Sequence, residues 1–360
     1  AASDLPEEIK NLPATIFTGY ERITDESEIL AIVKTGDDSN IVLKAVEDDE
    51  IILITQRTPF YAQSGGQATD TGKITSGDFA MEVDDVKRTA EGLFLHSGKV
   101  LSGNISTGDI VELIIDKEKR FDTARNHTTT HLLHKALKQV LGNHVAQAGS
   151  DVSSKRLRFD FSHFAAMTSE EKMEVERLVN AEILSDDEVV TKVMSIEEAK
   201  KDGATALFDE KYDNEVRVVS VGDYSMELCG GTHLKRSSQA CLFKIVSESA
   251  IAAGIRRIEG VTGSGAFEMV SEEEKLLKSA AENLKSGIND LPERVLALSE
   301  KVKMLEKNLE AKTNEIARAQ AGNLLDEAIE KLGSNGIKII LCTTTATMPK
   351  WMYDKYPEII

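Results

Sequence analysis

Residues 117–141 read KEKRFDTARNHTTTHLLHKALKQVL and lie where the sequence changes from one pattern to another. Apolar residues recur along this run at helical spacing, and Gly142-Asn143 follows it, so the pattern predicts one long helix. The apolar side consists of Ala124, Leu132, Leu133, Ala136, Leu137, Val140 and Leu141.

The stretch before this helix alternates between apolar and polar residues in short runs. From Ala14 to about Asp116 these runs are ILAIV, NIVLKAV, IILITQ, FAMEV and VELIID, separated by Gly, Asp and Ser clusters. Period-two runs of this length indicate antiparallel strands. Residues 1–116 are therefore predicted to form a small antiparallel β-barrel or a sandwich, with one long Gly-rich loop between Thr58 and Gly72.

The stretch after the helix mixes strand and helix patterns. The run RLRFDF predicts a strand with Leu157, Phe159 and Phe161 on one face. Residues 169–184 predict an amphipathic helix that is capped by Thr168 or Ser169. We therefore expect an α+β core over residues 117–262, and the fold class of the whole chain is predicted as α+β.

A heptad pattern follows the loop at residues 263–265. It predicts a long helical arm over residues 263–333, either a coiled coil, an oligomerisation arm or a helix packed on its own domain. Residues 334–360 include GIKIILCTTTAT, a buried-strand pattern with few partners left, which predicts the start of a truncated C-terminal domain. The seam consists of Leu291, Val295, Leu298, Val302, Leu305, Leu309 and Ile316.

The composition limits the class of protein. In this chain of 360 residues, 41% are hydrophobic and 29% are charged, a globular balance with no apolar run long enough to span a membrane. Three cysteines and no leader pattern predict a cytoplasmic protein. The net charge of −18 opposes broad electrostatic binding of nucleic acid, so such a partner would need a local basic face.

Two histidines on the predicted helix form half of a candidate metal site. His127 and His131 are four residues apart, which places both imidazoles on one helical face within reach of one ion. The helical zinc-protease motif has the same spacing, but it places a glutamate directly after the first histidine. Thr128 occupies that position here, which argues against a zinc protease.

The second half lies about one hundred residues downstream, in ELCGGTHL. Cys229 and His233 can fold back onto one ion, because the two glycines between them tolerate the positive φ angles of a tight turn. Together the two halves give three nitrogens and one sulfur, a set that suits zinc. If all four bind at once the site is closed, and if one is released a water or substrate group can occupy the open position.

One more histidine and two more cysteines are expected to have structural roles and not to bind the metal ion. His134 is one turn further round the helix and is expected at the surface or in an outer shell of the site. Cys241 lies in the apolar run CLFKIV and Cys342 lies in the C-terminal strand pattern, so both are expected in the core.

A family resemblance covers most of the chain. The motifs are FTGYE at Phe17, FYAQSGGQATDTG, RNHTTTHLLHKAL, HVAQAGS at residues 144–150, RLRFDFSH, ELCGGTHL and RRIEGVTG, followed by the helical arm. In this order they resemble the editing region of alanyl-tRNA synthetase and the freestanding AlaX editing proteins. The resemblance to the threonyl-tRNA synthetase editing domain is weaker, because that domain lacks the Ser-Gly-Gly-Gln loop.

The resemblance implies hydrolysis of the ester that joins serine or glycine to the 3′-terminal adenosine of alanine tRNA. It also implies one zinc ion per chain, which could activate water, polarise the ester carbonyl or only orient the tRNA end; the sequence does not choose between these roles. Thr130 and Gln147 are implied as catalytic pocket residues. Ser64, Gly65, Gly66 and Gln67 resemble the glycine-rich loop that lines the site.

Basic residues near the motifs are candidate contacts to tRNA phosphates. They are Arg125, Lys155, Arg156, Arg158, Lys235, Arg236, Arg256 and Arg257. No nucleotide-binding glycine loop with a following lysine is present, so no aminoacylation is expected from this chain, which resembles either a fragment of a synthetase or a trans-acting deacylase. Two rivals remain: a non-catalytic tRNA-binding and dimerising module with structural zinc, and a metallohydrolase of small esters or peptides.

Overall fold

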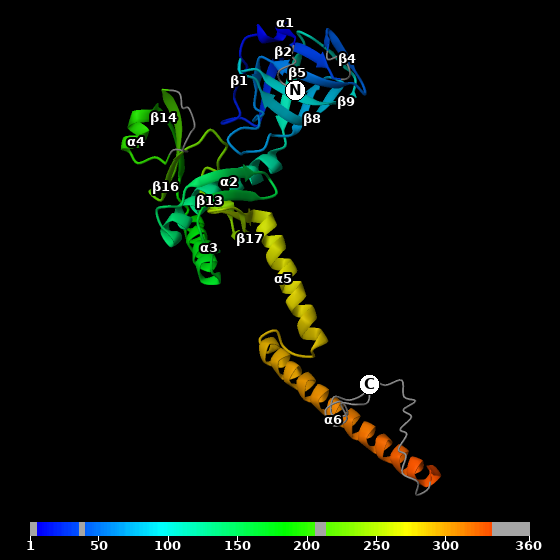
Figure 1. Cartoon of the computed structure of the whole chain (residues 1–360). Coiled ribbons are helices and arrows are strands. Elements are labelled where there is room, and N and C mark those ends of the chain that lie inside the picture. Colours follow the sequence, from blue (N-terminus) through cyan, green and yellow to red (C-terminus); the bar gives the residue numbers. More distant parts are fainter. Residues whose placement is uncertain (1–5, 36–39, 206–213, 333–360) are drawn as a thin grey trace. The chain divides into compact units, whose positions relative to one another are not determined.

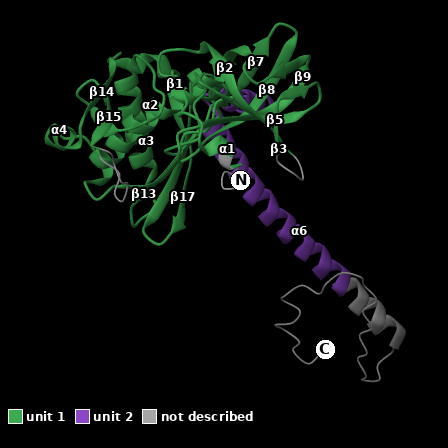
Figure 2. Cartoon of the chain, turned by 90° about the horizontal axis from the view of Figure 1, so that it is seen from above, with its two compact units in different colours: residues 1–271 green, residues 272–360 purple. Residues whose placement is uncertain are grey.

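The computed structural model describes residues 6–35, 40–205 and 214–332. The chain divides into two compact units, residues 1–271 and 272–360 (Figure 2). The predicted boundaries at residues 116, 262 and 333 stay predictions. The predicted C-terminal strand and Cys342 lie outside the described residues.

The first part of unit 1 is a closed antiparallel barrel (Figure 1). Its strands follow the order β11-β7-β8-β9-β5-β2, and β11 also pairs with β2, which closes the ring. The predicted barrel is thus confirmed, and the alternative of a sandwich is wrong. The ring consists of β2 (Thr24–Lys34), β5 (Glu50–Thr55), β7 (Gly72–Ser76), β8 (Phe79–Arg88), β9 (Phe94–Ser102) and β11 (Ile110–Ile115).

One short helix and several short strands accompany the closed ring. Strand β3 extends the barrel sheet beside β2, β1 pairs with β6, and β10 pairs with β4. These elements are α1 (Glu7–Lys10), β1 (Ile16–Phe17), β3 (Asn40–Val42), β4 (Lys44–Val46), β6 (Arg57–Thr58) and β10 (Asn104–Ser106).

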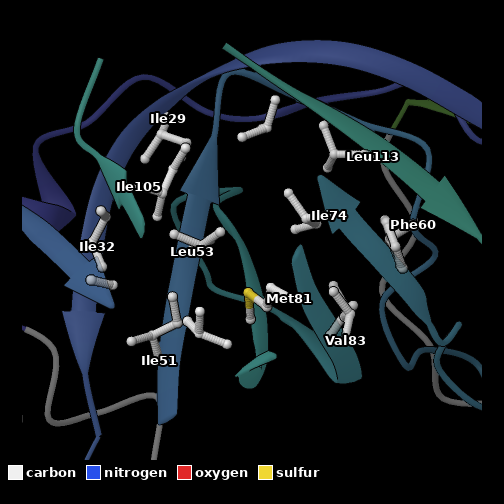
Figure 3. Packing of buried hydrophobic residues seen from close by; sticks show 14 of the residues in the cluster. Ile29, Ile32, Ile51, Leu53, Phe60, Ile74, Met81, Val83, Ile105 and Leu113 are labelled. Carbon is white, nitrogen blue, oxygen red and sulfur yellow. The ribbon is translucent and has the colours of Figure 1, made fainter. Parts of the chain in front are cut away.

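The barrel interior is filled by apolar side chains that alternate along the strands. In β2 every second residue from Asp25 to Ile29 is buried, as expected for a strand with one face inward. Figure 3 shows side chains from separate strands that point toward one another, among them Leu53, Ile74 and Met81. This packed interior leaves the loops at the barrel rim as the parts that contact the rest of unit 1.

Helix α2 spans Lys117–Leu141, as the sequence predicts. Asp116 caps its N-terminus by accepting a hydrogen bond from the Lys119 N–H, and Gly142 follows at its C-terminal end with a φ of 111°. Its buried residues are polar around His127 and His131 and, apart from His134, apolar from Leu132 onward. The helix therefore presents a polar stretch and an apolar stretch to the same unit.

A four-stranded antiparallel sheet packs against α2 and α3. Its strand order is β12-β13-β18-β17, with β12 at Gln147–Val152, β13 at Leu157–Ser162, β17 at Phe243–Ala252 and β18 at Ile255–Thr262. Helix α3 spans Ser169–Leu184, and Thr168 caps it in a capping box, as predicted. Leu157, Phe159 and Phe161 are fully buried in the core that these elements share.

A second, three-stranded sheet leads directly into the segment that carries Cys229 and His233. Its order is β14-β15-β16, with β14 at Val189–Ser195, β15 at Glu215–Val221 and β16 at Ser225–Leu228. Cys229 directly follows the end of β16. Helix α4 (Ile196–Lys201) and the 3-10 turn η2 (Ser237–Ala240) flank this region.

Two long helices follow residue 262. Helix α5 spans Gly263–Asn283 and α6 spans Leu291–Leu332. The first seam residue, Leu291, is buried, whereas the six others from Val295 to Ile316 are 45–69% exposed. Pairing of this seam with another helix stays a prediction.

No helix in the described ranges is both long enough and apolar enough to cross a membrane.

Candidate metal centre

Four side chains from two distant segments converge in unit 1. The candidate ligand atoms of His127, His131, Cys229 and His233 all lie within 4.8 Å of one another. The Nε2 atoms of His127 and His233 lie 3.4 and 3.3 Å from Cys229 Sγ. The two half-motifs are thus brought together as the sequence predicts.

The orientation of the His127 ring is fixed by Gln67 from the barrel loop. Gln67 Oε1 accepts a hydrogen bond from the Thr232 backbone N–H at 2.8 Å, and it also lies 2.8 Å from His127 Nδ1. Because an amide oxygen carries no hydrogen and can only accept, His127 Nδ1 carries the proton and, in the neutral ring, Nε2 keeps its lone pair. Gln67 Nε2 donates to Thr232 Oγ1 at 2.9 Å, which completes the bonding of the amide.

The other two imidazoles also have polar groups near their outward nitrogens. His233 Nδ1 lies 3.1 Å from the Thr128 hydroxyl, and His131 Nδ1 lies 3.8 Å from a carboxylate oxygen of Glu227. The second oxygen of Glu227 lies 2.9 Å from His134 Nδ1. The Thr128 hydroxyl thus contacts the outward nitrogen of His233, a kind of contact that orients metal-binding histidines. His131 Nδ1 is buried and has no hydrogen-bond partner among the described residues, and Glu227 is its charged neighbour.

The electrostatics favour a thiolate in the cluster. Burial opposes ionisation of Cys229, but the imidazoles of His127, His233 and His131 hold the pKa of the thiol well below its usual value. A lowered thiol pKa is the condition that metal binding by cysteine requires.

The pKa values of His233 and His131 shift in opposite directions, and the pKa of Glu227 is lowered. Burial lowers the pKa of His233 to about 3, which keeps this ring neutral. Burial also acts to lower the pKa of His131, but the charges of Glu227 and Cys229 raise it to about 9. Burial acts to raise the pKa of Glu227, yet His131 and His134 bring it below its ordinary value. An ion would therefore displace a proton from His131 on binding.

The two glycines of the ligand loop have a different role from the predicted one. Neither Gly230 nor Gly231 has a positive φ, so the expectation of a left-handed turn is wrong. A Cβ on Gly231 would lie 2.0 Å from His127 Cε1 and 2.8 Å from Gln67 Oε1, whereas a Cβ on Gly230 would meet nothing within 4 Å. Gly231 is needed because the His127 ring lies directly against its backbone.

The three threonines between His127 and His131 are all buried and have different contacts. Thr128 Oγ1 accepts from the Leu234 N–H at 3.1 Å, in addition to its contact with His233. Thr130 donates its hydroxyl proton to Asn126 O at 2.8 Å, which leaves its oxygen free to accept. Thr129 Oγ1 has no hydrogen-bond partner in the described part of the chain.

Gln147 lies at the first residue of β12, opposite Phe161 of β13. It is half-buried, and its amide makes no hydrogen bond with any described residue. Its predicted role, like that of Thr130, stays a prediction.

The Ser64–Gln67 loop is a tight turn against β12. Ser64 and Gln67 pair through their backbones, and Gly66 O accepts from the Val152 N–H at 2.7 Å. Gly65 and Gly66 have positive φ angles of 56° and 81°, and a Cβ on Gly66 would lie 2.6 Å from Ser150 O. Gln67 was expected to line the substrate site, and the structure places it behind His127.

Most of the predicted phosphate contacts are ion-paired. Arg257 makes two hydrogen bonds to Asp160 at 2.7 and 2.8 Å, and both lie on one face of the four-stranded sheet. The other paired arginines and their acidic partners are Arg125 with Asp122, Arg156 with Asp151 and Glu259, Arg158 with Asp151 and Asp160, Arg236 with Asp186, and Arg256 with Glu248. Lys155 and Lys235 are exposed and form no ion pair with any described residue.

The structure changes the interpretation of two residues and adds a third residue to the site. Cys241 is exposed, so its expected place in the core is wrong. His134 is buried and bonds to Glu227, so it is not a surface residue but supports the site from outside. Glu227 had no assigned role, although its position two residues before Cys229 in a strand pattern would place both side chains on one face.

Two family models match the barrel and the segment that carries Cys229 and His233, whereas His127 and His131 lie between the two matched ranges. The model for tRNA synthetases class II (A) matches residues 2–119, and the model for the threonyl and alanyl tRNA synthetase second additional domain matches residues 216–259. The barrel and the Cys229 segment are thus similar to domains of tRNA synthetases. A β-galactosidase model matches residues 321–360, which mostly fall outside the described residues.

Similar proteins specify the family further. The chain is 46% identical over 337 residues to the alanine–tRNA ligase of Acetivibrio thermocellus, covering 94% of this chain and 38% of that protein. It is 45% identical over 333 residues to that of Shouchella clausii and 44% identical over 348 to that of Pseudoalteromonas translucida, covering 92% and 97% of this chain and 37% and 39% of those proteins. The resemblance to the alanyl-tRNA synthetase family is confirmed, and the chain corresponds to less than two fifths of the length of these relatives.

Proposed function

We propose that this chain is a zinc-dependent aminoacyl-tRNA deacylase that removes serine or glycine from alanine tRNA. The observation that carries the proposal is the convergence of His127, His131, Cys229 and His233, with ligand atoms within 4.8 Å of one another. Three imidazoles and a thiolate suit zinc. The contact with Gln67 leaves Nε2 of His127 free to bind the ion, and binding would displace a proton from His131. The similarity to alanine–tRNA ligases supports the choice of tRNA.

The chemistry requires little beyond a positioned water and a polarised carbonyl, because an aminoacyl ester is already activated. Zinc, when bound, would supply a Lewis acid for this hydrolysis. Thr130 Oγ1 can accept a hydrogen bond from a substrate hydroxyl, since its own hydroxyl donates to Asn126 O. The amide of Gln147 has no partner among the described residues and remains available to the substrate.

This arrangement would spare the correct product. A hydrophobic pocket distinguishes amino acids that differ by one small group by only about 1–3 kcal/mol, so a synthetic site for alanine needs a second site that rejects serine. Polar pocket groups that pair with the serine hydroxyl would lose that partner with alanine. We therefore propose Thr130 and Gln147 as the residues that recognise serine.

The proposed partners extend to tRNA and to a second copy of the chain. Among the candidate basic residues, Lys155 and Lys235 are exposed and form no ion pair with a described residue, and we propose them as phosphate contacts ahead of the paired arginines. The exposed seam of α6 is proposed to form a homodimer. We propose no aminoacylation by this chain, whether it acts as a segment of a synthetase or as a freestanding deacylase.

The decisive experiment is deacylation of alanine tRNA charged with serine, glycine or alanine, with and without a chelator. We expect the serine ester to be hydrolysed and the alanine ester to persist, with activity lost on chelation and restored by zinc. A serine ester as stable with the chain as without it would refute the proposal and favour a non-catalytic module with structural zinc. Turnover of small esters without tRNA would favour a general metallohydrolase.

A further inference from the structure

Two side chains that are not metal ligands hold the backbone of the loop at residues 229–231. Arg217 Nη1 donates to Cys229 O and to Gly231 O, both at 2.8 Å. The Tyr20 hydroxyl donates to Gly230 O at 2.6 Å. Three consecutive carbonyl oxygens of the ligand loop are therefore bonded from outside the loop.

The two side chains also contact each other. The guanidinium carbon of Arg217 lies 4.1 Å from the centre of the Tyr20 ring, a distance that favours a cation–π interaction. Arg217 further accepts the Cys229 N–H at 3.0 Å through its own backbone oxygen. Both backbone polar groups of Cys229 are thus bonded to one residue of β15, and we name the pair the Tyr20–Arg217 clamp.

The barrel fixes the position of Tyr20. Phe17 packs edge-on against the Tyr20 ring at 4.9 Å between ring centres. A Cβ on Gly19 would lie 2.1 Å from Pro59 O, so the chain passes too close to Pro59 for any side chain there. Arg120 of α2 donates to Gly19 O at 2.7 Å and ties this segment to the helix that carries His127.

We propose that Tyr20 and Arg217 are positioning residues that hold Cys229 in place for the metal ion. The loop contains two adjacent glycines, whose backbones lose more conformational entropy on ordering than those of other residues. The hydrogen bonds from Tyr20 and Arg217 offset this loss and hold the loop in one conformation. Because Tyr20 belongs to the barrel, the barrel takes part in building the metal centre although it supplies no ligand. The proposal depends on metal binding at this site and is independent of whether the site hydrolyses an ester.

The test measures metal binding by the full chain with Arg217→Met, Arg217→Lys and Tyr20→Phe. Zinc affinity is determined by competition with a chromophoric chelator, and cobalt is used as a spectroscopic probe of the thiolate–metal bond. We expect Arg217→Met to lower zinc affinity by roughly 10–100-fold and to weaken the thiolate-to-cobalt absorption band. We expect Tyr20→Phe to cause a smaller loss, and Arg217→Lys an intermediate one because a lysine lacks the planar fork that reaches two carbonyls.

Two matched variants control for general effects. Tyr224→Phe removes a tyrosine hydroxyl that bonds to Gln139, and Arg177→Met removes an exposed arginine that pairs with Glu174. Both should bind zinc with wild-type affinity.

Wild-type zinc affinity and an unchanged cobalt spectrum in folded Arg217→Met and Tyr20→Phe would overturn the proposal. If Arg217→Met does not fold, Tyr20→Phe decides, because Tyr20 is 49% exposed and phenylalanine keeps its ring. Serine-ester hydrolysis is measured in parallel, and saturating zinc should restore it in the variants. A wild-type chain that binds zinc and hydrolyses nothing would refute the proposed function and leave the clamp test intact.

Discussion

The Cys229 thiol is the only sulfur in the cluster, and its lowered pKa results from the surrounding histidines. Cys229→Ala should lower zinc affinity by more than the roughly 10–100-fold typical of losing an outer contact, and the deacylation activity should fall with it. Elemental analysis of the purified variant and the charged-tRNA assay measure the two effects. Cys241→Ala is the matched control, because that cysteine is exposed and outside the cluster. Equal zinc content in the two variants would contradict the ligand assignment.

Gly231 and Gly230 offer a sharper comparison of neighbouring positions. In Gly231→Ala the new methyl group would lie 2.0 Å from His127 Cε1, so the ring or the loop must move and zinc affinity should fall by on the order of 10-fold or more. In Gly230→Ala the methyl group meets no atom within 4 Å, and the affinity should stay near that of the wild type. Chelator competition measures both. Similar affinities for the two alanine variants would show that the close packing on His127 does not matter.

Several residues have an exposure or contacts that local sequence patterns do not predict. Cys241 belongs to the apolar run CLFKIV but has a φ of 67° at the end of η2, and this turn leaves it exposed before the strand begins at Phe243. The roles of Gln67 and Thr128 depend on contacts between residues 60 or more positions apart, and the role of Arg217 depends on backbone atoms of the ligand loop. No local pattern encodes such contacts. The ligand spacings, in contrast, are local and were predictable.

At the scale of elements, the sequence predicted the exact first and last residues of two helices. Helices α2 and α3 have caps, regular apolar spacing and clear ends, and their observed bounds match the predicted ones. Strand β9 was not predicted, because His96 and Gly98 interrupt its alternation. Gly98 lies where a Cβ would be 1.8 Å from Glu82 O of the neighbouring strand, a requirement set by barrel closure.

His96 in β9 makes the barrel sensitive to acid. Its Nδ1 lies 3.0 Å from Leu53 O of β5 and its Nε2 lies 2.7 Å from the Thr58 hydroxyl of β6, so the neutral ring joins three strands. Burial lowers the pKa of His96 from 6.5 to about 4. The unfolded chain therefore binds a proton that the folded chain excludes, and stability is lost as the pH falls from about 6.5 towards 4.

This loss should amount to roughly 2 kcal/mol in the free energy of unfolding between pH 7 and pH 5. Urea unfolding at the two pH values, in the presence of chelator, compares the wild type with His96→Gln. The variant should be less stable at pH 7 and should lose less stability on acidification. Equal acid sensitivity of the two chains would contradict the role of His96.

At the scale of the whole molecule, the seam of α6 should control self-association. Leu298 and Leu305 are 48% and 52% exposed on the seam, while Leu296 and Met304 are 62% and 55% exposed off it. Replacing the first pair with glutamate should convert a dimer to a monomer in sedimentation velocity, because charges at seam positions oppose coiled-coil packing. The same replacements at Leu296 and Met304 should leave the dimer intact. Zinc content should be unchanged in both variants, since the cluster lies in unit 1.

The order of the two ligand segments along the chain determines when the metal can bind during protein synthesis. His127 and His131 leave the ribosome about one hundred residues before Cys229 and His233. A nascent chain that has exposed only the helical pair can offer an ion two nitrogens and no thiolate, so stable capture of the metal must wait until the second segment has emerged. Metal capture would therefore be a late step that requires both ligand segments to have left the ribosome, and a shortage of zinc at that point would leave the centre empty.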